Sequence, residues 1–178
     1  HSFPFSPPIF KGRIFFNEPK RGDVVVFKTP VDNRTDYIKR LIGLPGDKIQ
    51  FINSELYINN NLIFKNKTSN NDKIYCGKKI VDVFSFKEKL PNGYDYKTVY
   101  FKNGSFQNSD IFIVPKDNYF FLGDNRDCSK DSRYLSSVGS VHKDNLVGKA
   151  QFIFFSSDRS FGSIFYFWKW NQSIRFDR

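Results

Sequence analysis

The sequence predicts a mostly antiparallel β fold, and three observations support this prediction. Ring-bearing residues are abundant, with 22 Phe and 9 Tyr among 178 residues. Together with the many Ile and Val residues, they favour strands over helices. Apolar runs are short and are separated by turn signals such as Pro-Gly and Asn pairs. No segment keeps a helical period for more than a couple of turns.

The first half of the chain alternates between short apolar runs and turns. The opening, HSFPFSPPIFKG, holds three prolines and is expected to be extended coil leading into a strand at RIFF. The branched run VVVFK predicts a buried strand, and DYIKRLIG, after a polar turn, predicts another. The Pro-Gly pair in LPGD marks a tight turn. Asn-rich pairs then separate KIQFI, ELYI and LIF as hairpin strands.

The middle of the chain differs in composition. Between about residues 64 and 110, Lys, Asn, Ser, Asp and Gly dominate, which is typical of an inserted variable lobe or of long loops. Strands return at IFIVP and NYFFL, and residues 146–156 predict a further long strand. We therefore divide the chain into a core domain of residues 1–54 and 112–178 and an inserted variable lobe of residues 55–111.

Two adjacent cations stand inside the predicted strand Asp36–Gly43. Side chains alternate between the two faces of a strand, so Lys39 shares a face with Tyr37 and Leu41. Arg40 points to the opposite face. Whichever face is the core, one of the two cations is directed toward it.

A second polar cluster, GDNRDCSKDSR at residues 123–133, follows the apolar run NYFFL. Its eleven residues include three aspartates, two arginines and two serines. One interpretation is a surface loop held by local ion pairs, each worth about 0–1 kcal/mol. The other is a loop that positions a small hydroxyl, Ser129 or Ser132, with Asp–Arg pairs fixing its shape.

Three long motifs, taken in order, resemble conserved boxes of the bacterial type I signal peptidases: RGDVVVFK, DYIKRLIGLPGDKI and GDNRDCSKDSR. LVGKA is similar to the strand that follows the last box in that family. The resemblance covers roughly residues 20–53 and 118–155, and the middle of the chain matches only as a variable lobe. It implies a signal-peptidase-like β fold and a serine endopeptidase that uses a Ser–Lys dyad.

The resemblance also implies roles for individual residues. Lys39 falls on the general base, and Ser129 falls on the serine that hydrogen-bonds the lysine nitrogen and orients it. The remaining residues support the site or line the substrate pocket. The supporting residues are the pairs Asp131–Arg133 and Arg40–Asp124, with Gly123 and Asn125 shaping the loop; the pocket residues are Val26, Tyr37 and Ile38.

A lysine base needs a lowered pKa, because a lysine in water has a pKa of about 10.4. Burial among apolar groups disfavours the ammonium form and lowers that value. The apolar neighbours of Lys39 provide such surroundings. We therefore expect Lys39 to be largely buried, within hydrogen-bond reach of Ser129, and to face an open groove.

The nucleophile of the family lies in an S-M-x-P motif upstream of the R-G-D box, after one or more transmembrane helices. Neither Ser2 nor Ser6 has that context, and the chain contains no Met. We expect the chain to be a truncated portion on the periplasmic side of the bacterial inner membrane. On its own it is expected to be inactive.

Substrates and partners follow from the same resemblance. Signal peptides of exported preproteins are expected to bind as an added strand and to be cut after small residues, in the pattern Ala-x-Ala. The membrane surface is a further expected partner, and part of the aromatic tail, residues 161–170, is expected to touch it. The translocation machinery is an indirect partner. No cofactor, metal ion or nucleic acid is expected, and His1 and His142 form no ligand cluster.

Other interpretations remain open. The net charge of +10 attracts nucleic acid or anionic lipid, although A+T-rich coding would inflate Lys, Asn, Ile and Phe together. A basic, aromatic β-barrel that binds single-stranded nucleic acid, a self-cleaving SOS-repressor domain and a pseudoenzyme that binds preproteins are the alternatives. Cys76 and Cys128 lie far apart in sequence, and two unpaired thiols are favoured over a disulfide. Cys128 stands where the family has a residue such as Asn, and we expect it to have no role.

Overall fold

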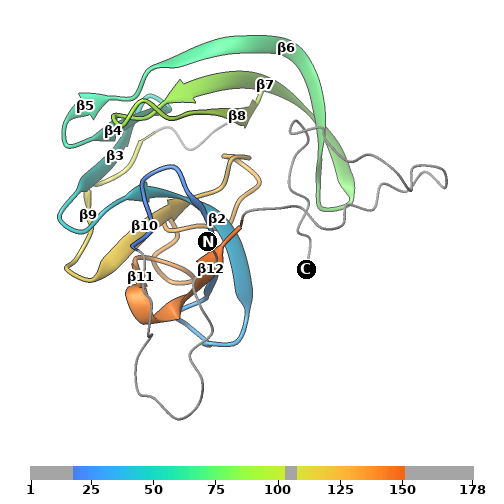
Figure 1. Ribbon diagram of the computed structural model, residues 1–178. Coiled ribbons are helices and arrows are strands. Elements are labelled where there is room, and N and C mark those ends of the chain that lie inside the picture. Colours follow the sequence, from blue (N-terminus) through green and yellow to red (C-terminus); the bar gives the residue numbers. More distant parts are fainter. Residues whose placement is uncertain (1–17, 103–107, 151–178) are drawn as a thin grey trace.

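The computed structural model describes residues 18–102 and 108–150, and this part of the chain forms three antiparallel sheets (Figure 1). The strand orders are β11-β10-β2-β1-β12, β5-β4-β3-β9 and β6-β7-β8. The predicted fold class is confirmed. The elements are β1 Val24–Lys28, β2 Asp36–Gly43, β3 Lys48–Ile52, β4 Glu55–Ile58, β5 Asn61–Leu62, β6 Lys65–Cys76, β7 Lys79–Lys89, β8 Asp95–Phe101, β9 Phe112–Ile113, β10 Asn118–Leu122, β11 Val141–His142, the 3-10 turn η1 Lys143–Asn145, and β12 Leu146–Lys149.

Strand β2 lies at the centre of the five-stranded sheet, between β1 and β10. Its two faces belong to different hydrophobic clusters. Leu41 packs with Val25 and Phe121 in one cluster, whereas Ile42 packs with Leu122 in the other. Because both faces of β2 are covered by apolar side chains, each of its two cations is directed toward a core.

Two tight hairpin turns join β3 to β4 and β4 to β5, as the Asn-rich pairs predict. Asn53 and Ser54 have φ of 50° and 65°, and Asn59 and Asn60 have φ of 52° and 66°. Two successive residues with positive φ form a type I′ turn, whose twist matches that of the strands, and Asn tolerates this conformation better than most residues. The turn predictions are confirmed.

The polar middle of the chain folds into long strands, so its interpretation as long loops was wrong. Strand β6 has 12 residues and β7 has 11, and they form a curved hairpin that arches over the top of the molecule in Figure 1. Most of β6 is exposed, and backbone pairing with β7 holds it in place. An exposed strand needs few apolar residues, which explains why composition concealed it. The domain division at residues 55–111 stays a prediction.

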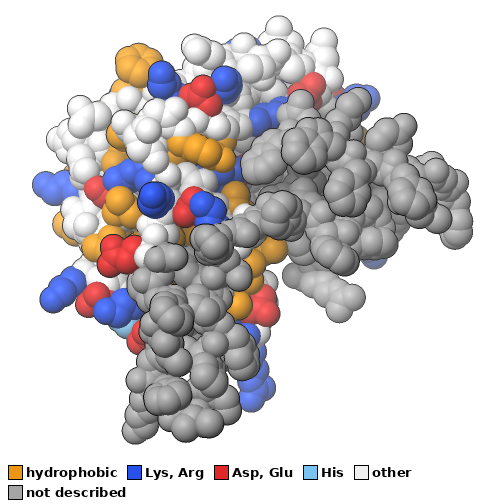
Figure 2. All heavy atoms as spheres, in the orientation of Figure 1, with side chains coloured by type: hydrophobic (Ala, Val, Ile, Leu, Met, Phe, Trp, Pro, Cys, Tyr) orange, Lys and Arg blue, Asp and Glu red, His pale blue; other side chains and the backbone are white. Residues whose placement is uncertain are grey.

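Several predicted segments lie outside the described residues: the strand at RIFF, the end of the strand predicted over 146–156, and the aromatic tail. Among described residues, no helix is long and apolar enough to cross a membrane. Figure 2 shows the Lys and Arg side chains of the visible face interspersed with Asp and Glu. On that face, the described cations therefore do not gather into one basic stripe of the kind that follows a nucleic-acid backbone.

Candidate active site

Lys39 lies half-buried near the middle of β2, where β10 ends beside it. Leu122, the last residue of β10, is opposite Arg40. Continuing this antiparallel register by one residue brings Gly123 beside Lys39. Desolvation lowers the pKa of Lys39; the carboxylates of Asp131 and Asp124 oppose this shift, and the Arg133 guanidinium adds to it. The net direction is downward, which a lysine base requires.

Ser129 is buried, and its side chain lies against Gly123. A Cβ atom on Gly123 would come within 2.1 Å of Ser129 Oγ, so only glycine fits there. Ser129 Oγ has no hydrogen-bond partner among the described residues. Gly123, the residue that follows β10, thus lies against the serine that the sequence singled out.

No hydrogen bond between Lys39 Nζ and Ser129 Oγ is formed in this conformation, and the role of Ser129 in orienting Lys39 stays a prediction. Lys39 Nζ instead lies 5.4 Å from the centroid of the Tyr37 ring, which shares its face of β2. The negative face of an aromatic ring attracts an ammonium group at this distance. The position of Lys39 Nζ over the Tyr37 ring therefore competes with a position beside Ser129. Strand alternation gives the face on which a side chain lies, but not which of these positions it takes.

Both predicted ion pairs are formed. Arg40 binds Asp124 through two bonds, Nε to Oδ1 and Nη2 to Oδ2, each 2.7 Å. Arg133 binds Asp131 in the same forked manner at 2.8 and 2.9 Å, and Asp131 Oδ2 also accepts from the Gly123 backbone N–H at 2.9 Å. Paired charged bonds of this kind fix orientation as well as distance. The loop that carries Ser129 is therefore held to β2 and to itself.

Burial lowers the pKa of Arg40, but the hydrogen bond and charge of Asp124 outweigh it and raise the pKa above its usual range. The guanidinium also lies 4.6 Å from the centroid of the Tyr96 ring on β8. The two adjacent cations of β2 thus have opposite surroundings. Arg40 is held charged by a carboxylate, whereas burial favours the neutral form of Lys39.

Further ion pairs join the motifs to each other, and sequence reasoning missed them. Arg21 of the R-G-D motif binds Asp47 of the LPGD turn at 2.9 Å, and Asp23 of the same motif binds Lys149 of β12 at 2.6 Å. Each motif places a charged residue next to a glycine, and this repeated pattern is the signal that could have indicated them.

Sequence reasoning also passed over Arg126, which is only 1% exposed. Its guanidinium forms an ion pair of 2.6 Å with Glu88 of β7, which is also buried. These two residues lie 38 positions apart in sequence, in the lobe and in the polar loop, and no local pattern connects them.

Cys76 and Cys128 form a disulfide, with Cα atoms 5.8 Å apart. The expectations of unpaired thiols and of no role for Cys128 were therefore wrong. The long β6–β7 hairpin brings Cys76, at the end of β6, to the polar loop beside Ser129. Sequence spacing could not reveal this contact, because the length of the hairpin was itself not predicted.

The three predicted pocket residues are all partly exposed, but they do not share a face. Val26 is directly opposite Ile38 in the β1–β2 pair, so their side chains lie together. Tyr37 points to the other face, beside Lys39 and 6.2 Å from the ring of Phe27. Asn125 shapes the loop: its Oδ1 accepts from the Cys128 N–H at 3.2 Å.

The first half of β2 has an edge that β10 does not cover. Among the described residues, β10 pairs only with Arg40 to Gly43, whereas β1 pairs with Asp36 to Arg40 on the other side. The backbone from Asp36 to Lys39 therefore presents one edge to which an extended peptide could add as a strand.

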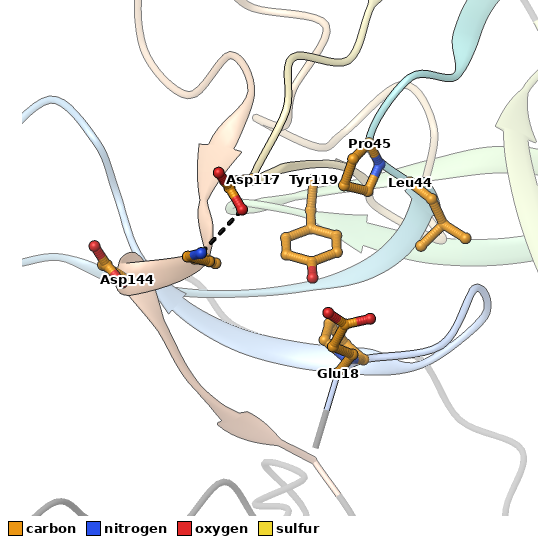
Figure 3. Close-up of a pocket in the computed structure, with 8 residues that line it drawn as sticks. Glu18, Leu44, Pro45, Asp117, Tyr119 and Asp144 are labelled. Atoms are coloured by element: carbon orange, nitrogen blue, oxygen red, sulfur yellow. Dashed lines mark hydrogen bonds and ion pairs between the residues drawn. The ribbon is translucent and has the colours of Figure 1, made fainter. Parts of the chain in front are cut away.

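A cavity of about 420 Å³ lies elsewhere, at the far end of β2 (Figure 3). Tyr119, Leu44 and Pro45 line its apolar part, and the Asp117–Lys143 ion pair of 2.9 Å lies at its side. None of the predicted site residues lines it. Within the described ranges, no three His, Cys, Asp or Glu side chains are grouped to hold a metal ion.

The fold and this cluster define a class of protein: a mostly antiparallel β domain with a lysine of lowered pKa inside a framework of buried ion pairs. Residues 8–155 match the sequence profile of the family described as "Signal peptidase, peptidase S26". The chain therefore belongs to the S26 family of signal peptidases, and the resemblance stated from its motifs is confirmed.

Two relatives matched by sequence agree with this assignment. Signal peptidase I of Rickettsia typhi is 45% identical over 186 residues, which covers 96% of this chain and 68% of that protein. Signal peptidase I of Rickettsia massiliae is 45% identical over 188 residues, with the same shares covered. Among solved structures, the crystal structure of a signal peptidase I from Enterococcus faecalis matches with a TM-score of 0.46 and 27% identity, covering 77% of this chain and 100% of that one.

Proposed function

We propose that this chain supplies the general base and its supporting framework to a Ser–Lys endopeptidase that removes N-terminal signal peptides from exported preproteins. Its family of signal peptidases supports this reaction. One observation carries the assignment of residues. Lys39, whose pKa is lowered, lies beside the end of β10, and the Gly123 that follows β10 lies against Ser129 Oγ, a buried hydroxyl without a partner among the described residues.

In the proposed reaction, neutral Lys39 takes the proton of a nucleophilic serine hydroxyl while the serine oxygen attacks the carbonyl carbon of the scissile bond. The C–N bond then breaks, and the Lys39 ammonium gives its proton to the departing amino group of the mature protein. Water next attacks the acyl-enzyme, and Lys39 accepts a proton from that water. The bond between the acyl carbon and the serine oxygen then breaks, Lys39 returns its proton to that oxygen, and the signal peptide leaves with a new carboxylate.

Ser129 has the role of orienting Lys39. A buried polar group left without a hydrogen bond costs about 1–3 kcal/mol, so the Ser129 hydroxyl favours any conformation that satisfies it. Rotation of the Lys39 side chain away from the Tyr37 ring would bring its nitrogen toward that hydroxyl. A neutral amine can both donate to a hydroxyl and accept from it, so this bond is compatible with the base form.

The substrate is proposed to bind as a strand along the uncovered edge of β2, from Asp36 to Lys39. Alternate side chains of an added strand point into the protein, which gives selectivity at every second residue. Small residues before the cleaved bond, in the pattern Ala-x-Ala, fit pockets lined by partly exposed β1 and β2 side chains. Val26, Tyr37 and Ile38 are the proposed lining residues.

The nucleophile is proposed to lie outside the motifs that this chain carries. Ser2 and Ser6 lack the S-M-x-P context, so the 178-residue chain alone is proposed not to cleave. The working enzyme is proposed to act at the bacterial inner membrane with this portion on the periplasmic side, in contact with the lipid surface. It would meet preproteins as the translocation machinery delivers them.

The test replaces Lys39 with Ala in a form of the enzyme that contains the nucleophile, with cleavage of a preprotein followed by gel. Processing should fall by about 100- to 10,000-fold, the usual contribution of a general base. Lys48→Ala, at an exposed position on β3, is the matched control and should leave processing unchanged. Wild-type processing by Lys39→Ala would overturn the assignment.

A further inference from the structure

Arg126 is a cation of the polar loop that is only 1% exposed, and side chains of the lobe enclose it. Its Nη2 donates to Glu88 Oε2 at 2.6 Å and to the Tyr96 hydroxyl at 2.8 Å, and its Nη1 donates to the Tyr100 hydroxyl at 2.8 Å. Glu88 comes from β7, and the two tyrosines come from β8. The lobe therefore forms a buried binding site for the guanidinium of Arg126.

Glu88 is the centre of this site. Its carboxylate accepts from Tyr96 at 2.6 Å, from Tyr100 at 2.9 Å and from Thr98 at 3.2 Å, in addition to Arg126. Burial raises the pKa of Glu88, but the charge of Arg126 and these hydrogen bonds outweigh it and hold the pKa below its usual range. Glu88 is thus charged, and its oxygens are occupied by donors.

Stability alone does not account for such a network. A buried ion pair is often no more stabilising than apolar side chains of the same volume, because removing two charges from water costs several kcal/mol per ion. A guanidinium cannot lose its proton inside a protein. Arg126 can therefore be buried in the lobe only next to an anion, which is the Glu88 carboxylate. The network therefore selects one position of the loop.

The backbone at Arg126 connects this network to the site. The Arg126 N–H donates to Val99 O of β8 at 3.0 Å, and the Val99 N–H donates to Asp124 O at 2.9 Å. The Arg126 carbonyl accepts from Arg133 Nη2. Arg133 binds Asp131, which holds the Gly123 N–H beside Ser129.

We propose that Glu88 is a positioning residue for the peptidase reaction: through Arg126 it fixes the loop that presents Ser129 to Lys39. This inference rests on the proposed function of Lys39 and Ser129. It makes the lobe a working part of the active site, because the lobe binds the loop through Arg126. Glu88 touches neither the substrate nor the reacting atoms.

The experiment compares Glu88→Gln with the wild type, in a form of the enzyme that contains the nucleophile, using a signal-peptide substrate below the unfolding temperature of both proteins. Small misplacements of catalytic groups cost about 100-fold in rate, so kcat should fall by about 10- to 100-fold while KM changes by less than about threefold. Active sites are counted with a serine-directed covalent inhibitor, so a loss of folded protein does not appear as a loss of kcat. Asp95→Asn is the matched control, because Asp95 lies on β8 and its carboxylate forms an exposed ion pair with Lys87 of β7.

A second variant separates positioning from simple stabilisation. Glu88→Gln with Arg126→Gln removes both charges, so no buried cation is left unpaired, and the thermal stability lost in the single variant should be regained in large part. If Glu88 positions the loop, kcat per active site stays low in the double variant. This variant also decides the question if the single variant does not fold.

An unchanged kcat per active site in either folded variant would overturn the positioning role. The Lys39→Ala variant, measured in the same assay, shows whether such a result contradicts only the role of Glu88 or the proposed function itself. If Lys39→Ala is inactive while Glu88→Gln keeps its kcat, only the role of Glu88 is wrong. If Lys39→Ala is as active as the wild type, the proposed function itself has failed.

Discussion

Ser129 occupies the space that a side chain on Gly123 would need, since a Cβ there would lie 2.1 Å from Ser129 Oγ and 2.3 Å from Ser129 Cβ. No Cβ atom in a real protein comes so close to its neighbours. The glycine of the GDN segment is thus required by one particular hydroxyl, and the two residues act as a unit.

Gly123→Ala should therefore displace Ser129 and reduce both activity and stability. Overpacking a buried site costs about 1–3 kcal/mol, and urea unfolding of the 178-residue chain measures it. Ser129→Gly, which opens the same space, should recover most of that stability when combined with Gly123→Ala. If the two substitutions are strictly additive in the free energy of unfolding, the two side chains are not in contact.

The pH dependence of processing should reflect the lowered pKa of Lys39. A base works only when it has lost its proton, so kcat/KM should rise with pH through the pKa of Lys39 in the free enzyme. Because burial lowers that pKa, the rise should occur below the range of an ordinary lysine. A pH–rate profile checks this, and a rise only near the pKa of an exposed lysine would contradict it.

Reduction of the Cys76–Cys128 bridge should destabilise the fold. The two cysteines are 52 residues apart, and closing a loop of that length stabilises a protein by about 4 kcal/mol in the chain-entropy account. Cys76→Ser with Cys128→Ser should lower the free energy of unfolding toward that extent. Dithiothreitol should do the same to the wild type and nothing to the variant. Equal stability of the wild type with and without reductant would show that the bridge contributes nothing.

The lobe should lose stability in acid through Asp72. Hydrogen bonds from Ser85, Ser69 and Lys97 lower the pKa of Asp72 to about 2. A carboxylate whose folded pKa is depressed stabilises the protein above its unfolded pKa, and this stability is lost as pH falls from about 4 to about 2. Amide hydrogen exchange in β6 and β7 should show this loss in the wild type. In Asp72→Asn the dependence on pH in that interval should be smaller, and an identical dependence would exclude Asp72 as its source.

Local features of this fold could be predicted from the sequence. Strands β1 and β2 begin and end where branched residues and polar turns place them, and the predicted turns form at Asn53-Ser54 and Asn59-Asn60. These features depend on side-chain alternation and backbone preference over a few residues. The ion pairs Arg40–Asp124 and Asp131–Arg133 could be predicted only from the resemblance to a family, because the motifs that contain these residues match its conserved boxes.

The remaining features depend on contacts between distant segments. Nothing near Glu88 indicates that an arginine 38 residues later enters its site. To predict the Cys76–Cys128 bridge, one would need the length of the β6–β7 hairpin. The polar composition of that hairpin does not indicate strands. The position of Lys39 Nζ near Tyr37 depends on side-chain rotation, which strand periodicity does not determine.

The opposite faces of β2 also make the chemistry depend on register. A slip of one residue relative to its neighbours would turn each of the two cations to the other face. Depending on the direction of the slip, either the permanently charged guanidinium of Arg40 or the apolar side chain of Ile38 would stand in the place of the base. Gly43 opposes such a slip, because a Cβ there would lie 2.8 Å from Phe120 Cβ, and both neighbours of Gly43 carry larger side chains than a methyl group. A misregistered molecule would thus be both badly packed at Gly43 and without a proton acceptor in the place of Lys39.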